Sequence, residues 1–71
     1  MILATVREWD DDEGWGVLDS PETPGGCWTS FSAVEMEGFR FLTAGQKVTL
    51  EWEAAEQDGF QYQAVRVVLA D

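Results

Sequence analysis

Hydrophobic and polar residues alternate along most of this chain, in short runs separated by clusters of Gly, Pro and Asp. An alternation of period two is typical of β-strands, and no stretch has the 3.6-residue apolar period of a long helix. The runs that we predict as strands are Ile2 to Trp9, Trp15 to Asp19, Cys27 to Phe31, Lys47 to Ala54 and Phe60 to Leu69. After the third run, Ser32 is placed to cap a single helical turn. Five short strands favour a small closed barrel, because closure removes the exposed edges of an open sheet.

The first run breaks its alternation near Arg7. Strict alternation places Glu8 on the same face as Val6, where burial of an unpaired carboxylate is costly. We therefore predict a β-bulge near Arg7, which turns Glu8 outward and Trp9 toward the interior.

The two C-terminal runs differ in how clearly they indicate a buried face. In the fourth run every second residue is apolar, and we predict that these residues face the core: Val48, Leu50, Trp52 and Ala54. The fifth run is ambiguous, because its apolar residues share one face with polar ones: Val65, Val67 and Leu69 with Gln61 and Gln63.

The second and third runs together predict an aromatic outer surface. If Leu18, Cys27 and Thr29 point into the core, the alternate residues of both runs point outward. These outward residues are Trp15, Val17, Trp28 and Ser30. Clustered exposed aromatic rings are costly for a monomer to keep, and flat rings on a strand pair form a stacking surface for unpaired nucleobases.

The composition narrows the possible functions. The 71 residues leave room for one domain, residues 1–71, and their 14 acidic against four basic side chains give a net charge of −10, which disfavours capture of polyanions. The chain has no His and one Cys, which excludes a Ser-His-Asp catalytic triad, a zinc site built from His and Cys, and an internal disulfide. We expect no enzyme activity, no metal and no cofactor, and interpret the acidic run 10–13 as a solvated turn. No apolar run approaches the ~20 residues that span a bilayer, and signal-peptide features are absent, so we expect a cytoplasmic protein without a membrane partner.

The second and third runs, with the residues around them, match a known pair of motifs. Glu13-Gly14-Trp15-Gly16-Val17-Leu18 is similar to Lys-Gly-Phe-Gly-Phe-Ile, and Cys27-Trp28-Thr29-Ser30-Phe31-Ser32 is similar to Val-Phe-Val-His-Phe-Ser. Ala4-Thr5-Val6-Arg7 resembles Gly-Thr-Val-Lys, and Gly38-Phe39-Arg40 and Gly45-Gln46 follow at the matching spacing. Over nearly its entire length the chain thus resembles the cold-shock domain family.

This resemblance implies a five-stranded antiparallel Greek-key barrel of the oligonucleotide-binding (OB-fold) type, whose outer face binds single-stranded RNA or DNA. By position it implies base stacking by four aromatic residues, with an added edge from Phe60: Trp15, Trp28, Phe31 and Phe39. Arg7 takes the family's basic position beside this surface. Val17 and Ser30 stand where the family has Phe and His, and Glu8 and Glu13 stand where it has Trp and Lys.

Two functions remain open. Because stacking surfaces remain while the basic residues number only four (Arg7, Arg40, Lys47 and Arg66), the first is weak binding of single-stranded RNA or DNA carried by stacking. The second is a protein-interaction module that uses the same aromatic face with its acidic rim, for a basic protein partner or for self-association as a homodimer.

Overall fold

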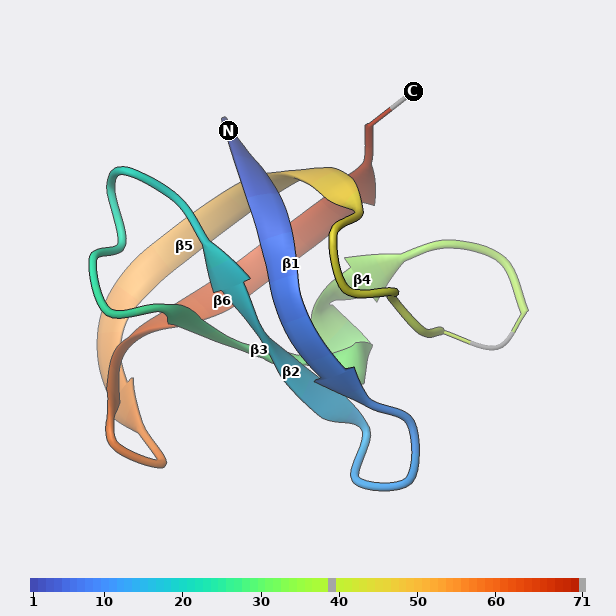
Figure 1. The fold of residues 1–71 in the computed structure, drawn as a ribbon, viewed down its shortest axis with the longest axis horizontal. Coiled ribbons are helices and arrows are strands. Elements are labelled where there is room, and N and C mark those ends of the chain that lie inside the picture. The colour runs from blue at the N-terminus through green and yellow to red at the C-terminus, as the bar shows by residue number, and fades with distance from the viewer. Residues whose placement is uncertain (39, 71) are drawn as a thin grey trace.

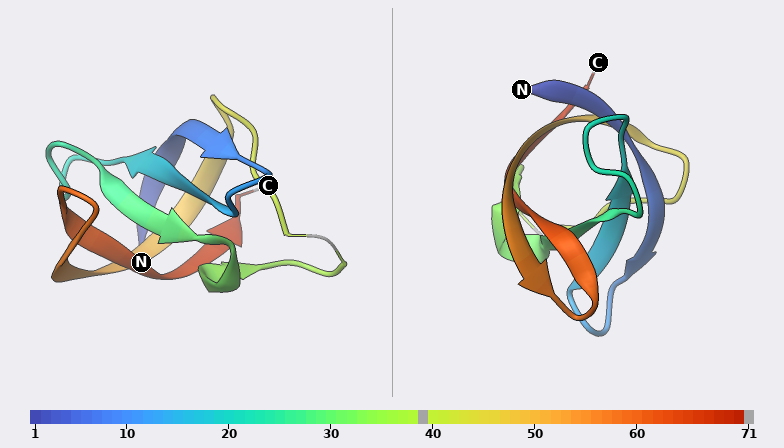
Figure 2. Two further views of the ribbon diagram at one scale, coloured as in Figure 1. Left: turned by 90° about the horizontal axis from the view of Figure 1, so that it is seen from below. Right: turned by 90° about the vertical axis from the view of Figure 1, so that its left-hand side faces the viewer.

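Six strands wind into a closed barrel in the computed structural model, which describes residues 1–38 and 40–70 (Figure 1). The strands are β1 (Ile2–Asp10), β2 (Trp15–Asp19), β3 (Cys27–Ser30), β4 (Val34–Glu35), β5 (Lys47–Gln57) and β6 (Phe60–Leu69). Their order is β3-β2-β1-β5-β6-β4, and an additional β3–β6 pairing closes the barrel, as the end-on view in Figure 2 shows. The five longer strands confirm the predicted all-β barrel, and β4 is a two-residue addition beside β6.

The chain path is a Greek key. Strands β1, β2 and β3 follow one another as antiparallel neighbours, and the long connection after β3 returns the chain to place β5 beside β1. The pairings are antiparallel except for two that involve β6: the closing one, in which β3 and β6 run parallel through Cys27–Tyr62 and Trp28–Gln63, and that of the short β4, which is also parallel to β6. No helix of the described residues has the length and apolar character needed to cross a membrane.

The predicted bulge in β1 is confirmed, and Arg7 is the extra residue. Val6 pairs with Leu18 and Glu8 pairs with Val17, so Arg7 has no partner in β2. As a result Glu8 is exposed, and Trp9 packs against the core.

A second bulge resolves the ambiguous facing of β6. Glu51 pairs with Arg66 and Trp52 with Ala64, which leaves Val65 as an extra, exposed residue. The bulge shifts the alternation by one residue, so that Ala64 before it and Val67 after it both face the interior.

Ten buried residues fill the barrel: Ala4, Val6, Leu18, Cys27, Val34, Leu42, Val48, Leu50, Ala64 and Val67. At one end Trp52 and Tyr62 pack edge to face, with ring centroids 5.3 Å apart, and the indole N–H of Trp52 donates to Glu22 at 3.1 Å. The prediction that Ala54 is buried is wrong. Ala54 is exposed although its register partner Tyr62 packs against the core, and the β5–β6 register becomes irregular directly after Ala54.

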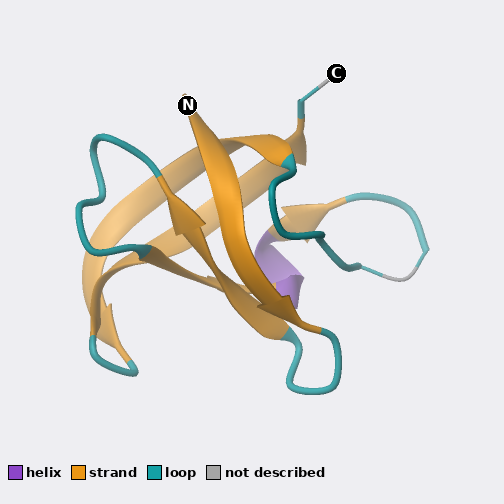
Figure 3. Ribbon diagram, viewed as in Figure 1, coloured by secondary structure: helices purple, strands orange, loops and turns teal. Residues whose placement is uncertain are grey.

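The helical turn after β3 starts two residues earlier than the sequence indicates. It is a 3₁₀ helix, η1 (Phe31–Ala33), drawn as the purple segment in Figure 3. Ser30, rather than Ser32, is its cap: the Ser30 hydroxyl oxygen accepts the backbone N–H of Ser32 at 3.2 Å. Strand β3 therefore ends at Ser30, and Phe31 belongs to the turn.

Candidate nucleic-acid interface

Two tryptophan rings lie side by side on the outer surface of β2 and β3. Trp15 and Trp28 have ring centroids 6.0 Å apart and an interplanar angle of 25°. The register places Trp15 opposite Ser30 and Val17 opposite Trp28, while the alternate residues of both strands are buried. Neither indole belongs to the core cluster or packs against it. The register thus places both indoles on the side of the sheet opposite the core, as alternation predicts, but both are half-buried instead of exposed, and the indole nitrogen of Trp28 is buried without a hydrogen-bond partner among the described residues.

Phe31 extends this surface toward the β1–β2 turn. Its backbone N–H donates to the Gly14 carbonyl oxygen at 2.8 Å, and half of its side chain is exposed (50%). Gly14 has a positive φ of 77°, and a Cβ at this position would lie only 3.1 Å from Phe31 Cδ1. A glycine is thus needed here both for the backbone angle and for the close approach of the ring. We call Trp15, Trp28 and Phe31 the aromatic platform.

A cleft of about 440 Å³ opens beside Phe31. It is lined by Asp11, Asp12, Glu13, Gly14, Phe31, Gly38 and Arg40. The turn that carries the three acidic residues is held by Asp10, whose carboxylate accepts the Glu13 backbone N–H at 2.9 Å. This end of the platform thus combines an aromatic ring with hydrogen-bond acceptors and one arginine.

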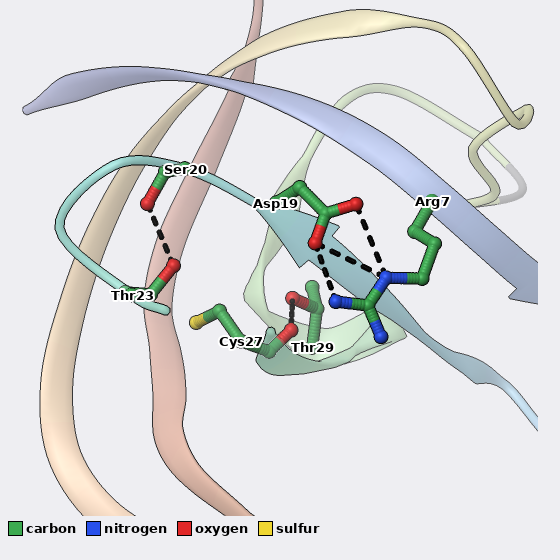
Figure 4. A network of polar contacts seen from close by, with 6 residues as sticks. All are labelled: Arg7, Asp19, Ser20, Thr23, Cys27 and Thr29. Carbon is green, nitrogen blue, oxygen red and sulfur yellow. Dashed lines mark hydrogen bonds and ion pairs between the residues drawn. The ribbon is translucent and has the colours of Figure 1, made fainter. Parts of the chain in front are cut away.

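Arg7 lies at the other end of the platform and is held by Asp19. Its Nε donates to both carboxylate oxygens of Asp19 at 3.1 Å, and Nη2 donates to Oδ1 at 2.5 Å (Figure 4). The hydrogen bond to Asp19 raises the pKa of Arg7 above its ordinary value, and the neighbouring Glu8 carboxylate adds to the effect. Arg7 therefore keeps its charge but shares it with a carboxylate of the same chain.

The prediction that Val17 presents an exposed surface is wrong. Val17 is on the outer side of β2, outside the core cluster, but only 1% of it is exposed. A Cβ on Gly26 would lie 2.7 Å from Val17 Cγ1, 3.0 Å from Arg7 Nη2 and 3.1 Å from Phe60 Cε1. Arg7 and Phe60 thus gather with Gly26 over this position, and Val17 lies buried beneath them.

The remaining predicted site residues are placed as follows. Ser30 is half-buried, and its hydroxyl bonds to the Ser32 hydroxyl at 2.9 Å as part of the cap of η1. Phe60 is half-buried where it meets Gly26. Phe39 lies outside the described residues. The structure therefore brings Trp15 and Trp28 together and sets Phe60 beside Arg7, away from the cleft.

The other three basic residues differ in how their charge is compensated. Arg66 is ion-paired with Glu35 at 2.6 Å, and Lys47 donates to the Thr5 hydroxyl at 2.8 Å. Arg40 lines the cleft. The Arg66–Glu35 pair is exposed, so solvent and salt screen it, and it lowers the attraction of Arg66 for phosphate without abolishing it.

Sequence reasoning missed Asp19 as part of this site. The alternation of β2 did place Asp19 on the same face as Trp15 and Val17. Its pairing with Arg7, however, depends on the bulge, which makes Arg7 the unpaired residue between Val6 and Glu8.

Comparison with known proteins identifies relatives over most of the chain. It is 34% identical to the cold shock-like protein CspA of Stigmatella aurantiaca over 68 residues, covering 96% of this chain and 98% of that protein. It is 34% identical to cold shock protein 1 of Lactiplantibacillus plantarum over 80% of this chain and 85% of that protein. The chain belongs to the cold-shock protein family. The cold shock-like protein CspA of Shewanella violacea is 39% identical over 69% of this chain and 70% of that protein. A scan against protein-family models finds no match.

As a cold-shock protein, the chain places its two motif-like segments on adjacent strands, with the platform between the acidic turn at one end and the Arg7–Asp19 pair at the other. The acidic turn and the cleft adjoin Phe31, and the Arg7–Asp19 pair adjoins Val17 and Phe60. Glu8, at the position where the resemblance leads us to expect a Trp, stands directly opposite Val17 in the register.

Proposed function

We propose that this cold-shock protein binds single-stranded RNA or DNA on the aromatic platform, and that base stacking supplies most of the affinity. Membership in the cold-shock family supports nucleic-acid binding in general. The observation that carries the finer proposal is the near-parallel pair of Trp15 and Trp28 on the outer surface, separate from the core. Rings held in this way are preorganised, so bases can stack on them without moving the fold.

The platform is large enough to hold a short strand. Each stacked base contributes about 1–3 kcal/mol, so three rings supply about 3–9 kcal/mol before the cost of ordering the strand. Because that cost removes a substantial part of the gain, we expect weak binding.

Charge is the reason we expect stacking to dominate over phosphate contacts. The protein carries a net charge of −10, its acidic turn borders the cleft, and the Arg7 guanidinium already donates hydrogen bonds to Asp19. Each phosphate contact normally makes log K fall with log salt by a slope of about 0.7 for single strands. Here salt also screens repulsion between acidic protein and phosphate, so we expect a flat or inverted salt dependence.

The test is a titration of ¹⁵N-labelled protein with a short oligothymidine at low and high salt. The four Trp residues give four indole N–H signals, and Trp9 and Trp52 pack against the core. We expect the Trp15 and Trp28 signals and the Phe31 amide to shift while the two core indoles stay in place. A methylphosphonate oligothymidine, which has the same bases and no backbone charge, should bind at least as tightly at low salt. A steep loss of affinity at high salt, or unchanged platform signals, contradicts the proposal.

The cleft favours a second candidate function, recognition of a basic protein. Asp11, Asp12 and Glu13 next to the Phe31 ring suit a Lys or Arg side chain, which would gain ion pairs and a cation–π contact. Binding of a basic peptide would weaken with salt, opposite to the behaviour expected for the oligonucleotide. Sedimentation of the free protein over a range of concentrations tests the related case of self-association through the platform.

A further inference from the structure

We infer that Asp19 is an internal competitor for nucleic-acid phosphate, occupying in the free protein the Arg7 guanidinium that a bound strand would otherwise contact. The inference rests on the proposed function, since it concerns the Arg7 end of the same surface. It assigns a role to a residue that neither the motif pattern nor the family resemblance singles out.

The geometry of the pair is that of a ligand contact. Two nitrogens of Arg7 face the carboxylate of Asp19, with contacts of 2.5 to 3.1 Å, and Figure 4 shows the guanidinium turned toward it. A guanidinium presents the same fork of N–H donors to a carboxylate and to a phosphate. The Asp19 carboxylate therefore satisfies Arg7 in the way a phosphate would.

The location of the pair makes this competition relevant to binding. Arg7 Nη2 reaches the place where Val17, Gly26 and Phe60 meet, next to Trp28 across the β2–β3 register. A strand whose bases stack on the tryptophans carries its phosphates within reach of this end. At the opposite end the acidic turn repels them, which leaves the Arg7 end as the favoured path for the backbone.

A second cation lies in the same row as Asp19. Thr5 is the register partner of Asp19 in β2 and of Lys47 in β5, so the three residues lie side by side across β2, β1 and β5. Lys47 donates to the Thr5 hydroxyl at 2.8 Å. Thr5 thus separates Asp19 from Lys47 in this row, and Arg7 is the basic residue that the Asp19 carboxylate contacts.

The pair is accessible enough to open. The side chains of Arg7 and Asp19 are 39% and 49% exposed, so water and a ligand can reach both. Exposed ion pairs of this kind shift an equilibrium by up to about fivefold. A strand whose phosphate binds Arg7 must break the Arg7–Asp19 ion pair, and the Asp19 carboxylate then lies beside that phosphate and repels it. Arg7 therefore adds little net affinity in the natural protein.

Asp19→Asn tests the inference, because it removes the charge of the competitor and keeps its shape. We expect about fivefold tighter binding of oligothymidine, and a log K against log salt slope that becomes more negative by about 0.7, the value for one new phosphate contact. Glu35→Gln is the matched control: it changes the net charge equally and frees Arg66 from its 2.6 Å pair, on β4 and β6. Glu35→Gln should change the affinity for oligothymidine only by the small amount that is due to the net charge.

The double variant Arg7→Gln/Asp19→Asn shows whether Asp19 acts through Arg7. It should bind like Arg7→Gln apart from the net-charge effect seen for Glu35→Gln. In the unsubstituted protein, the Arg7 Nε–H signal should shift on addition of oligothymidine as its acceptor changes from carboxylate to phosphate. This signal needs no variant and so does not depend on how a substituted chain folds.

The outcomes separate the inference from the proposed function. If the Trp15 and Trp28 signals shift with oligothymidine but Asp19→Asn and Glu35→Gln behave alike, the platform binds nucleic acid and the inference is wrong. If the affinity gain of Asp19→Asn persists undiminished in the double variant, Asp19 does not act through Arg7, and the inference is again wrong. If neither tryptophan signal responds in any variant, the proposed function fails and the inference fails with it.

Discussion

Phe31→Ala is the variant that most directly measures how much a single ring contributes to the platform. Half of the Phe31 side chain is exposed, and the residue lies outside the core cluster. The hydrogen bond that joins it to Gly14 is made by the backbone N–H and survives the substitution. The fold should therefore be retained, with a change in the free energy of unfolding of about 1 kcal/mol or less.

The expected effect on binding is much larger than the effect on stability. Removing the ring eliminates one stacked base, about 1–3 kcal/mol, which corresponds to an affinity about 5- to 150-fold lower. The lost ring also leaves the cleft without its aromatic wall, so only the acidic side chains and Arg40 remain there to meet a base. We therefore expect the loss in the upper half of this range.

Fluorescence anisotropy of a labelled oligothymidine measures the change, at low salt to keep conditions equal. Leu3→Ala is the control, because Leu3 is also exposed (60%) and apolar but lies on β1 outside the platform. Leu3→Ala should bind like the natural protein. If Phe31→Ala also binds like the natural protein while the Trp15 and Trp28 signals still respond to the strand, Phe31 is not part of the binding surface.

Three further predictions concern the departures from the family pattern and the fold itself. Glu8→Trp and Glu13→Lys together should tighten oligonucleotide binding by about tenfold or more in the same anisotropy assay. Glu8→Trp adds a ring opposite Val17, and Glu13→Lys reverses a charge in the cleft. If the double variant does not bind more tightly, the proposed surface is contradicted. Burial raises the pKa of Cys27 to about 11, so the thiol ionises at lower pH in the unfolded state than in the folded one. The free energy of unfolding measured in urea should therefore be constant below pH 9 and fall by roughly 2–3 kcal/mol toward pH 11. Cys27→Ala should lack this fall. Gly16→Ala should lower the free energy of unfolding by about 1–3 kcal/mol or more, because its Cβ would come within 2.5 Å of Trp9 Cε3 and closer still to the Glu8 carbonyl oxygen; an unchanged urea midpoint would show that β1 shifts freely here.

The two bulges show which parts of the fold the sequence could and could not predict. The one at Arg7 was predictable, because Glu8 on the buried face would have been an unpaired charge, and only one solution removes it. The bulge at Val65 was not predictable, because both faces of that run contain apolar residues. A shift by one residue would still place apolar side chains toward the core, so the alternation does not distinguish the two facings. Its position is determined by Trp52 and Ala64, which pair across the two strands once the barrel is closed.

The candidate site divides in the same way. The outward direction of Trp15 and Trp28 follows from local alternation alone, since their strand neighbours are apolar or small and buried. The burial of Val17 does not, because Gly26 and Phe60, which cover it together with Arg7, come from segments far apart in the sequence. Local pattern thus predicts which face a residue occupies, and long-range packing decides whether it remains exposed there.

The bulge at Arg7 also determines the electrostatics of the platform. Without the extra residue, Arg7 and Glu8 would point to opposite sides of β1; with it, both side chains are exposed, Arg7 reaches Asp19, and Glu8 stands opposite Val17. One backbone irregularity therefore brings a cation and an anion to the same surface, and Asp19 adds a second anion, so the local charge beside the tryptophans is negative although an arginine is present. If bases stack on the platform as proposed, this surface should distinguish ligands by the area of their rings more than by their charge. This is the physical reason why the strongly acidic composition is compatible with the proposed nucleic-acid binding at the platform.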